Sequence, residues 1–542
     1  MTETVSRAAP VGPVGSARMT REERRVIVAS SLGTVFEWYD FYLYGSLAAV
    51  ISTQFFAGVN ETAAFVFALL AFAAGFAVRP FGALVFGRIG DMVGRKYTFL
   101  VTIVIMGGAT FAVGLLPNYA AIGVAAPIIL IALRLLQGLA LGGEYGGAAI
   151  YVAEHAPPGR RGRHTAWIQT TATVGLFLSL VVILAARWIT GEAFNDWGWR
   201  IPFLLSAVLL GVSVWIRLKL EESPVFQRLK AEGKQSRSPL SDSFARWGNL
   251  KLVLIALFGA VAGQAVVWYT GQFYALFFLT QTLKVDATLA NLLIAGSLIL
   301  GTPFFLVFGA VSDRIGRKPI VLGGLALACL TYFPIFNALT AAANPALARA
   351  QAASEAVIVA DPATCSFQFN PVGTAAFTTD CDKARAALSR ASVSYRNQAA
   401  PTGSATVIRI GATELAGFDA ASLNAAIAAA GYPAAADPDA INIPLVLALL
   451  TLLVIYVTMV YGPIAALLVE MFPARIRYTS MSLPYHIGNG WFGGFLPSVS
   501  FALVAMSGDI YYGLWYPVII AAATFIIGAL ALPETHRKTL VD

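Results

Sequence analysis

The sequence has little charge. Only 12% of its 542 residues are Asp, Glu, Lys or Arg, against about a quarter in an ordinary soluble protein, whereas 58% are apolar. Its three cysteines are too few for a disulfide scaffold and lack the spacing of a zinc or iron–sulfur site. Its four scattered histidines offer no nucleophile–base pair or metal cluster. These absences exclude a soluble globular enzyme, and we expect no enzymatic activity, no cofactor and no metal.

Long apolar runs take the place of charge. Twelve stretches have about the twenty residues that cross a ~30 Å hydrocarbon core. They are Val26–Ser52, Ala63–Phe86, Tyr97–Leu116, Ile122–Gly143, Thr165–Trp188, Ile201–Leu218, Leu252–Thr280, Leu289–Val311, Ile320–Leu339, Ile443–Leu467, Met481–Met506 and Gly513–Leu532. They predict an all-α integral membrane protein with twelve transmembrane helices. The first run is too long for a cleavable signal peptide, so we expect it to stay as an anchor.

Basic residues concentrate in alternate loops. Lys and Arg cluster at both ends of the chain and after even-numbered runs, as at Arg95 and Lys96 or Arg317 and Lys318, whereas the short odd-numbered loops carry very few. This asymmetry predicts that both termini are cytoplasmic. The net charge of +8 is then explained by orientation, and we expect no nucleic-acid partner.

One connection is much longer than the others. It runs from Ala342 to Ile441, is rich in Ala, and falls on the periplasmic or extracellular side. Cys365 and Cys381 lie in it, and in the oxidising periplasm of a bacterium they are predicted to form a disulfide. A helix at 420–430 and a short strand at 407–410 favour a small ordered lobe. An unstructured Ala/Pro-rich extension is the alternative.

The chain contains an internal repeat. The segment GRIGDMVGRK at 87–96 recurs as GAVSDRIGRK at 309–318, an offset of 222 positions. Glu154, Pro157 and Arg161 recur as Glu470, Pro473 and Arg477, but the offset is now 316. The difference places an insertion in the second half. The predicted organisation is a tail at 1–25, a six-helix bundle at 26–219, a linker at 220–250, helices 7–9 at 251–341, the insert at 342–441, helices 10–12 at 442–532 and a tail at 533–542.

These motifs resemble those of a known superfamily. The repeated G-x-x-x-D-x-x-G-R-K loop and the R-x-x-Q-G sequence at 134–138 are similar to signatures of the major facilitator superfamily. EWYDFYLYG at 37–45, RPFG at 79–82 and GGEYGG at 142–147 narrow the resemblance to the metabolite:proton symporters, bacterial importers of organic acids and compatible solutes. The resemblance implies a bacterial inner (plasma) membrane location. Met92, where the loop motif usually has a basic residue, and the long insert depart from it.

Four charged residues lie inside the predicted helices of the first half. Glu37, Asp40, Arg79 and Arg134 are costly at this depth unless they pair or line a water-filled path. Glu37 and Asp40 share a helix face, so one of them should hold a proton readily. We therefore expect Asp40 or Glu37 to couple transport to protons. Fixed ion pairs with Arg79 and Arg134 are the alternative, and a pair that opens on protonation would unite both.

Several mid-depth polar and aromatic residues are candidates for solute binding or coupling. Arg134 can hold a carboxylate through two parallel hydrogen bonds. The other candidates are Tyr44, Gln137, Gln264, Trp268, Tyr269, Gln272, His486 and Asn489. Packing is the alternative for the aromatic residues, and a neutral, hydrogen-bonded state is the default for His486. The glycines at 138, 142 and 146 predict close helix packing.

A third group of charged residues lies near the predicted cytoplasmic ends of the helices. Asp91 and Asp313 can engage helix N-termini or Arg groups of neighbouring loops, and thereby close the inner side. The family resemblance implies the same role for the loop motif. The inner-gate candidates are Arg79, Asp91, Arg95, Glu144, Glu154, Arg161, Asp313, Arg317, Glu470 and Arg477. The alternative for the basic residues is that they only set the orientation of the helices in the membrane.

Together these features predict two pseudo-symmetric six-helix bundles with a midplane site and alternating access. The expected function is proton-coupled uptake of a small metabolite, with an organic acid such as a dicarboxylate or keto acid preferred. Uptake of a betaine- or proline-like osmolyte and exchange or efflux are alternatives. A receptor that senses ligand through the insert is the alternative from another class. The expected partners are the solute, protons and the lipid bilayer, with a monomer as the functional unit.

Overall fold

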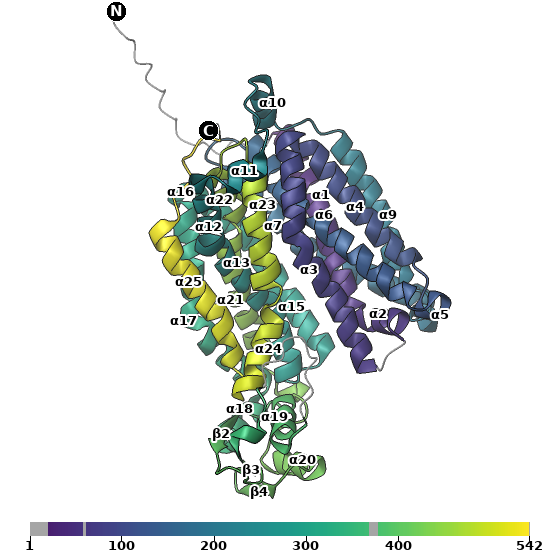
Figure 1. Ribbon diagram of the computed structural model, residues 1–542, viewed down its shortest axis with the longest axis vertical. Coiled ribbons are helices and arrows are strands. Elements are labelled where there is room, and N and C mark those ends of the chain that lie inside the picture. The colour runs from purple at the N-terminus through teal and green to yellow at the C-terminus, as the bar shows by residue number, and fades with distance from the viewer. Residues whose placement is uncertain (1–19, 58–60, 368–377, 541–542) are drawn as a thin grey trace, which may run out of the picture.

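The computed structural model describes residues 20–57, 61–367 and 378–540. Most of the predicted N-terminal tail and the last two residues therefore lie outside the described part of the chain. Two groups of long helices lie side by side, and a small lobe with strands extends from one end of them (Figure 1). The C-terminal end, α10 (Pro224–Ala231) and α11 (Pro239–Phe244) lie at the opposite end. We call these two ends the cap side and the terminus side.

The N-terminal bundle is formed by the first half of the chain. Its helices are α1 (Arg21–Ser46), α2 (Ala48–Phe55), α3 (Glu61–Met92), α4 (Arg95–Leu115), α5 (Tyr119–Ile122), α6 (Ala125–His155), α7 (Arg161–Gln169), α8 (Thr171–Thr190) and α9 (Arg200–Leu218). A short 3₁₀ segment, η1 (Gly191–Phe194), precedes α9. The helices α10 and α11 then lead to the second bundle.

The C-terminal bundle begins with a helix that contains π-helical turns. This helix comprises α12 (Trp247–Ala256), η2 (Leu257–Val261), α13 (Ala262–Tyr269), η3 (Thr270–Tyr274), α14 (Ala275–Phe277) and η4 (Phe278–Thr282). The remaining elements are α15 (Ala287–Gly301), α16 (Pro303–Ile315), α17 (Arg317–Ala343), α21 (Ile443–Tyr461), α22 (Ile464–Met471), α23 (Arg477–Ile487), η7 (Gly488–Gly493), α24 (Leu496–Ser507), η8 (Tyr512–Leu514) and α25 (Trp515–Ala531).

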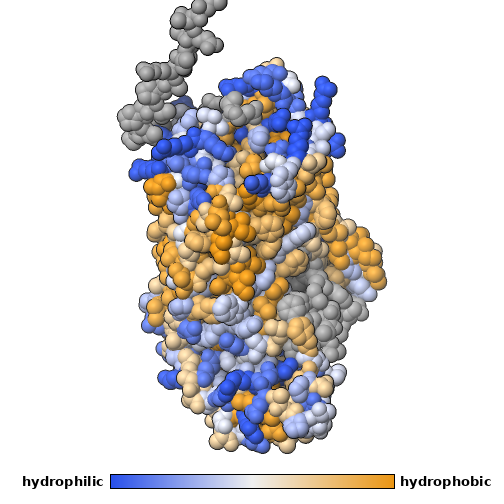
Figure 2. All heavy atoms as spheres, turned by 60° about the vertical axis from the view of Figure 1, so that its left-hand side comes forward, coloured by the Kyte–Doolittle hydropathy of each residue, from blue (hydrophilic) through white to orange (hydrophobic). Residues whose placement is uncertain are grey.

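The helical body has the surface of a membrane protein. Ten helical segments of the described chain are long and apolar enough to cross a bilayer, and α1 and α3 complete the predicted set of twelve. In α1, the charged Glu37 and Asp40 interrupt the apolar run. Figure 2 shows a broad belt of hydrophobic surface across the face in view, between more hydrophilic ends. Leu184, Leu330 and Leu530 are among the exposed apolar residues, which suits contact with lipid tails.

Glycines allow α3 and α6 to lie in close contact. A Cβ atom at Gly82 would lie 1.9 Å from the carbonyl oxygen of Leu139, and one at Gly142 would lie 2.3 Å from that of Arg79. Gly138, in the same stripe of α6 as Gly142, faces the backbone of α3 in the same way. The predicted packing role of this stripe is thus confirmed. The close contact fixes Arg79 of α3 relative to Arg134 of α6.

The insert is an ordered lobe on the C-terminal bundle, which we call the cap (residues 344–442). Its elements are α18 (Pro345–Ala353), β1 (Ala356–Ala360), η5 (Pro362–Thr364), α19 (Asp380–Arg390), β2 (Tyr395–Ala399), β3 (Val407–Ile410), β4 (Thr413–Ala416), α20 (Ala420–Ala429) and η6 (Pro438–Ala440). The sheet order is β2-β1-β3-β4, with only the β1–β2 pair parallel. The predicted strand and helix match β3 and α20, which Asp419 caps. The ordered alternative therefore describes the insert.

The cap is attached to the cap-side ends of the second bundle. The Tyr395 backbone N–H donates to the Gly508 carbonyl, and its hydroxyl donates to the Ala505 carbonyl at 3.1 Å. The Lys284 ammonium donates to the Arg390 carbonyl at 2.8 Å. Buried apolar side chains continue from this bundle into the cap. Because backbone and core are shared, the cap moves with the C-terminal bundle.

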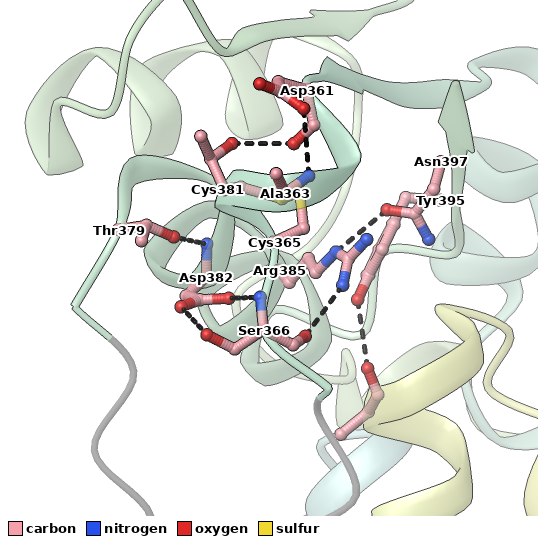
Figure 3. The surroundings of a disulfide bond; sticks show 12 residues. Asp361, Ala363, Cys365, Ser366, Thr379, Cys381, Asp382, Arg385, Tyr395 and Asn397 are labelled. Atoms are coloured by element: carbon pink, nitrogen blue, oxygen red, sulfur yellow. Dashed lines mark hydrogen bonds between the residues drawn. A yellow bond between two sulfur atoms is a disulfide. The ribbon is translucent and has the colours of Figure 1, made fainter. Parts of the chain in front are cut away.

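A disulfide joins the two cap cysteines in the structure. The Cα atoms of Cys365 and Cys381 are 5.3 Å apart, and the bond links the end of η5 to α19 (Figure 3). Next to it, the Asp382 carboxylate accepts hydrogen bonds from the Ser366 backbone N–H and hydroxyl at 2.8 and 2.7 Å. Partial burial acts to raise the pKa of Asp382, but these bonds and those from Thr379 hold it below its usual value. Residues 368–377 lie outside the described chain.

The disulfide leads to a test of cap stability. We expect the Cys365→Ser, Cys381→Ser double variant to weaken the cap by ~3 kcal/mol, because cross-linking a loop of this length restricts the unfolded chain. Hydrogen exchange of the amides of β1 and β3 measures the change. Peptide mapping without reductant should show a linked pair with Cys329 free. Unchanged amide protection in the double variant would contradict this role of the bond.

Candidate functional site

Asp40 and Arg134 form a buried ion pair inside the N-terminal bundle, in which both Asp40 oxygens are hydrogen-bonded. The Arg134 Nη1 lies 3.0 Å from one Asp40 carboxylate oxygen, and the other oxygen accepts from the Thr110 hydroxyl at 2.9 Å and the Gln137 amide at 3.3 Å. Gln137 in turn accepts from Arg134 at 2.8 Å, and the Tyr44 ring lies 3.6 Å from the guanidinium carbon. Helices α1, α4 and α6 thus hold one polar network at mid-depth. Arg134 Nε and Nη2 have no hydrogen-bond partner among the described residues.

Glu37 and Arg79 form a second, looser pair. Glu37 lies almost one turn before Asp40 on α1, and Arg79 lies on α3. Their nearest charged atoms are 3.9 Å apart, and 9% of the Glu37 and 11% of the Arg79 side chain is exposed. The Arg79 guanidinium carbon lies 4.4 Å from the centre of the Phe76 ring. All four intramembrane charges predicted from the sequence are therefore paired within one bundle.

A small cavity separates the two ion pairs. Helices α1, α3 and α6 line it with Asp40, Phe41, Gly75, Phe76, Arg79, Arg134, Gln137, Gly138 and Leu141. It has room for about one or two water molecules. The sequence predicted a site between the two bundles, whereas this cavity is lined by the N-terminal bundle alone. The reason is that aromatic side chains of both bundles fill the space between them in this conformation.

The mid-depth contact between the bundles is aromatic. The rings of Trp38 and Trp268 are 5.0 Å apart, and the Tyr145 and Tyr485 rings stack at 3.7 Å. Tyr485 also shares a hydrogen bond with the hydroxyl of Tyr461. These ring contacts fill the space between the two bundles at mid-depth.

Other predicted binding residues lie around this contact. Gln264 and Asn489 exchange amide hydrogen bonds at 3.2 and 3.3 Å, which joins α13 to η7. Gln272 accepts from the Tyr42 hydroxyl at 3.4 Å across the two bundles. His486 is buried, and the polar group that interacts with its ring is the backbone of Gly142 in the other bundle.

Two aspartates of the repeated motif bridge the bundles on the terminus side. Asp91 of α3 accepts from the backbone N–H groups of Tyr478 and Thr479 in α23, at 3.2 and 2.8 Å. In the symmetric contact, Asp313 of α16 accepts from Gly162 and Arg163 at the start of α7, both at 2.8 Å. Each carboxylate thus lies at a helix N-terminus of the opposite bundle, where unpaired N–H groups favour negative charge.

The second repeated motif supplies crossed ion pairs at the same level. Arg161 of the first bundle lies 3.3 Å from Glu470 of the second, and Arg477 of the second lies 2.6 Å from Glu154 of the first. Glu470 also pairs with Arg317 at 3.1 Å. These side chains are nearly or fully buried. We call these crossed pairs and the two aspartate contacts the terminus-side gate, and it is closed in this structure.

The glycine that recurs in both copies of the loop motif has a local cause. Gly94 and Gly316 have φ values of 145° and 111°, which side chains with a Cβ rarely adopt. A Cβ there would lie 2.3 and 2.4 Å from the carboxylates of Glu222 and Glu534. Those carboxylates accept from the first backbone N–H groups of α4 and α17. The glycine in each copy therefore admits an anionic helix cap.

The C-terminal tail lies across the gate. Arg161 donates to the Lys538 carbonyl at 2.7 Å, and Arg477 donates to the Leu540 carbonyl at 3.2 Å. The Thr535 hydroxyl donates to Glu470 at 2.8 Å. The tail therefore contacts gate arginines from both bundles.

Two predicted gate residues lie elsewhere. Glu144 pairs with Arg217 of α9 at 2.5 Å inside the N-terminal bundle, and Arg79 lies at mid-depth beside Glu37. Arg95 is in the gate region, where it pairs with Asp91 at 3.0 Å and donates to the Ala474 carbonyl.

Sequence reasoning did not find several partners of these groups. Thr110, Arg217 and Tyr461 lie in apolar runs with no repeat or motif to single them out, and Tyr145 lies in the GGEYGG segment, to which no contact was assigned. Arg217 also stands near a helix end, where a basic residue is expected for orientation alone.

The fold and these sites define a transporter of the major facilitator superfamily. The family model described as "Sugar (and other) transporter" matches residues 26–245 and 402–542, about two thirds of the chain. The chain therefore belongs to the sugar (and other) transporter family. The predicted fold class and superfamily are confirmed.

Characterised relatives are bacterial transporters. The chain is 36% identical to the inner membrane metabolite transport protein YhjE of Escherichia coli over 60% of its own length and 74% of that protein. It is 37% identical to the proline/betaine transporter of E. coli over 58% of itself and 64% of that protein. It is also 37% identical to the shikimate transporter of E. coli, over 59% of its own length and 73% of that protein.

Solved structures share the fold at low sequence identity. The proton:xylose symporter XylE bound to 6-bromo-6-deoxy-D-glucose aligns with 96% of this chain and 98% of its own, at 16% identity and a TM-score of 0.65. The inward-open conformation of XylE from E. coli aligns with 96% and 98% at 15% identity and a TM-score of 0.50.

The gate geometry leads to a test by thiol labelling. Ser482 of α23 is fully buried, and its hydroxyl faces Gly146 of the other bundle. We expect Glu470→Gln to speed maleimide labelling of a Ser482→Cys reporter about tenfold or more. The reason is that unpairing buried Arg161 and Arg317 costs the closed state ~3–5 kcal/mol. The reporter requires Cys329→Ala, and labelling is followed by mass spectrometry.

The exposed Glu232, which pairs with Lys234 on the surface, provides the control. Glu232→Gln should leave the labelling rate unchanged. Equal rates in the Glu470→Gln variant and the parent would contradict a gate held by these pairs.

Proposed function

We propose that this protein imports a small carboxylate-bearing solute together with protons, and that a zwitterionic osmolyte is the solute class that fits best. The observation that carries the proposal is the Asp40–Arg134 pair beside a water-sized cavity at mid-depth. A buried pair of this kind is costly to break while both groups are charged. Protonation of Asp40 removes that cost.

Proton and solute can then enter the site as a unit. When Asp40 is neutral, Arg134 has lost its counter-ion and needs an anionic partner. A solute carboxylate meets that need through the parallel N–H groups of the guanidinium. Asp40 is the proposed proton carrier, and Glu37 is the alternative carboxylate for this role.

The proposed orientation places the terminus side in the cytoplasm. Lys and Arg cluster on that side, which is the side that retains basic loops. The closed terminus-side gate then corresponds to an outward-facing or occluded state. For import, Asp91 and Asp313 must separate from the helix N-termini of the opposite bundle. The gate residues therefore stabilise one end state of an alternating-access cycle, the state in which the cytoplasmic side is closed.

The solute class is inferred from chemistry that the named relatives share. Betaine, proline, ectoine, pipecolic acid and shikimate, which occur in the names of relatives, all carry a carboxylate. Most of them also carry a positively charged nitrogen. The Glu37–Arg79 pair keeps one charge of each sign when Asp40 is protonated, which suits a solute that carries both charges. An organic acid co-transported with a proton is the second candidate, favoured by Arg134 and by the shikimate-transporting relative.

The remaining candidates take supporting roles in this proposal. Gln264, Trp268, Tyr269, Gln272, His486 and Asn489 supply the C-terminal bundle's side of the solute path. The cap moves with that bundle on the periplasmic side, and a single chain contains both halves of the path. Cap residues take no part in coupling.

Two variants test the coupling. We expect Asp40→Asn to abolish accumulation driven by a pH gradient but to retain solute exchange down a gradient, because a neutral amide cannot release a proton. We expect Arg134→Gln to weaken solute binding by ~2–5 kcal/mol. Uptake of labelled glycine betaine, L-proline and shikimate into proteoliposomes measures both effects.

Asp196→Asn, which changes an exposed carboxylate near the cap-side end of the first bundle, should leave accumulation unchanged. Undiminished accumulation by Asp40→Asn would show that another group carries the proton. Loss of exchange as well as accumulation in that variant would show that Asp40 is needed for binding or folding instead.

A further inference from the structure

The two intramembrane ion pairs differ in how well they are satisfied. The oxygens of Asp40 accept bonds from three donors at 2.9–3.3 Å. Glu37 accepts no hydrogen bond from any described residue, and its one ionic contact, with Arg79, is 3.9 Å long. The Arg79 Nε is buried without a partner. The Asp40 carboxylate is therefore satisfied within the described protein, and the Glu37 carboxylate is not.

Incomplete pairing at this depth is costly. The Glu37 side chain is 9% exposed and that of Arg79 is 11% exposed, so bulk water does not solvate them well. Buried charges are normally hydrogen-bonded as well as paired. A contact of 3.9 Å exceeds hydrogen-bond length. The spare bonding capacity of both groups is available to a ligand.

The surroundings of the pair are aromatic and come from both bundles. Phe76 lies against Arg79, and its ring is 6.5 Å from that of Tyr269 in the C-terminal bundle. Tyr269 lies within electrostatic range of both Arg79 and Glu37, and Tyr485 lies within that of Glu37. Aromatic faces attract organic cations. Phe76 thus borders the cationic group, and Tyr269 of the opposite bundle lies behind Phe76 near the pair.

We propose that Glu37 and Arg79 bind the two ends of a zwitterionic solute: Arg79 joins Arg134 across the shared cavity in binding its carboxylate, and Glu37 with the adjacent rings binds its ammonium group. This inference rests on the proposed function and assigns its solute class to particular residues. The solute inserts its opposite charges between those of the protein, so each charge gains a partner. A simple anion is attracted by Arg79 but repelled by Glu37. A simple cation is attracted by Glu37 but repelled by Arg79.

The assignment separates the choice of solute from its coupling to protons. Arg134 responds to the proton on Asp40, as proposed above, whereas Glu37 and Arg79 select which solute is bound. Because Tyr269 and Tyr485 belong to the opposite bundle, a solute in this position contacts both bundles. Solute binding can therefore influence how the bundles move relative to each other.

The test compares three probes that differ only in charge. Glycine betaine is the zwitterion, choline replaces its carboxylate with a hydroxymethyl group, and 3,3-dimethylbutanoate replaces its nitrogen with carbon. We expect the purified protein to bind glycine betaine and to bind the other two probes at least about tenfold more weakly, because each lacks one of the two charges that the pair engages. Scintillation proximity binding measures the affinities without requiring transport.

Variants assign each charge to one end of the solute. Glu37→Gln should weaken glycine betaine binding about tenfold or more. The same variant should raise the affinity for 3,3-dimethylbutanoate relative to that for glycine betaine. Arg79→Gln should weaken glycine betaine likewise and shift preference toward choline. The double variant Glu37→Arg, Arg79→Glu keeps an ion pair but reverses its direction. It should bind no better than either single variant, whereas a purely structural pair predicts rescue.

Two controls separate selectivity from folding. Arg200 donates only to backbone carbonyls at the end of the first bundle, so Arg200→Gln should leave the probe preference unchanged. Glu37→Asp and Arg79→Lys should retain the preference with weaker binding. Thermal unfolding is recorded for each variant, and preference ratios are compared only among folded proteins.

The outcomes distinguish the inference from the proposed function. If the wild-type protein binds 3,3-dimethylbutanoate or choline as well as glycine betaine, or if Glu37→Gln and Arg79→Gln leave the preference unchanged, the inference is wrong. If it fails to bind glycine betaine but accumulates shikimate under a pH gradient, the inference is wrong while the proton-coupled import of carboxylates stands. If no probe is bound or accumulated, both are wrong.

Discussion

Charges that leave water must find partners, and this constraint organises the whole protein. At mid-depth, Arg134 keeps Asp40 fully bonded. On the terminus side, crossed pairs between Arg161 and Glu470 and between Arg477 and Glu154 join the two bundles. Each group is buried in a medium where an unpaired charge is strongly disfavoured. A change of protonation or the arrival of a charged solute can therefore alter which conformation is stable.

The internal repeat turns single pairs into a two-sided gate. Asp91 and Asp313 occupy equivalent positions and each reaches the helix N-terminus of the opposite bundle. Equivalent glycines, Gly94 and Gly316, admit equivalent carboxylate caps behind them. Both aspartates must leave their helix N-termini for the gate to open, so the closed state is cooperative. The C-terminal tail adds contacts to both gate arginines and so favours the same state.

Much of the architecture and of the gate could be predicted from the sequence, because apolar runs, basic loops and a repeated motif are local or periodic signals. The repeat offset also located the insert. The partners could not be predicted in the same way. Glu144 has the same chemistry as Glu154, yet it pairs with Arg217 inside one bundle. Tyr145 and Tyr461 are indistinguishable in sequence from packing aromatics. Which residues meet depends on how two bundles dock, and no local pattern records that docking.

The central claim is that paired charges hold the terminus side closed until proton and solute act together. Pulsed electron paramagnetic resonance tests it with spin labels on two exposed pairs, Arg163 with Arg314 on the terminus side and Asn195 with Asn291 on the cap side. The account predicts that acid with a transported solute lengthens the first distance and shortens the second, while either alone leaves both largely unchanged. A terminus-side distance that stays the same under all conditions, or that lengthens without solute, would contradict it.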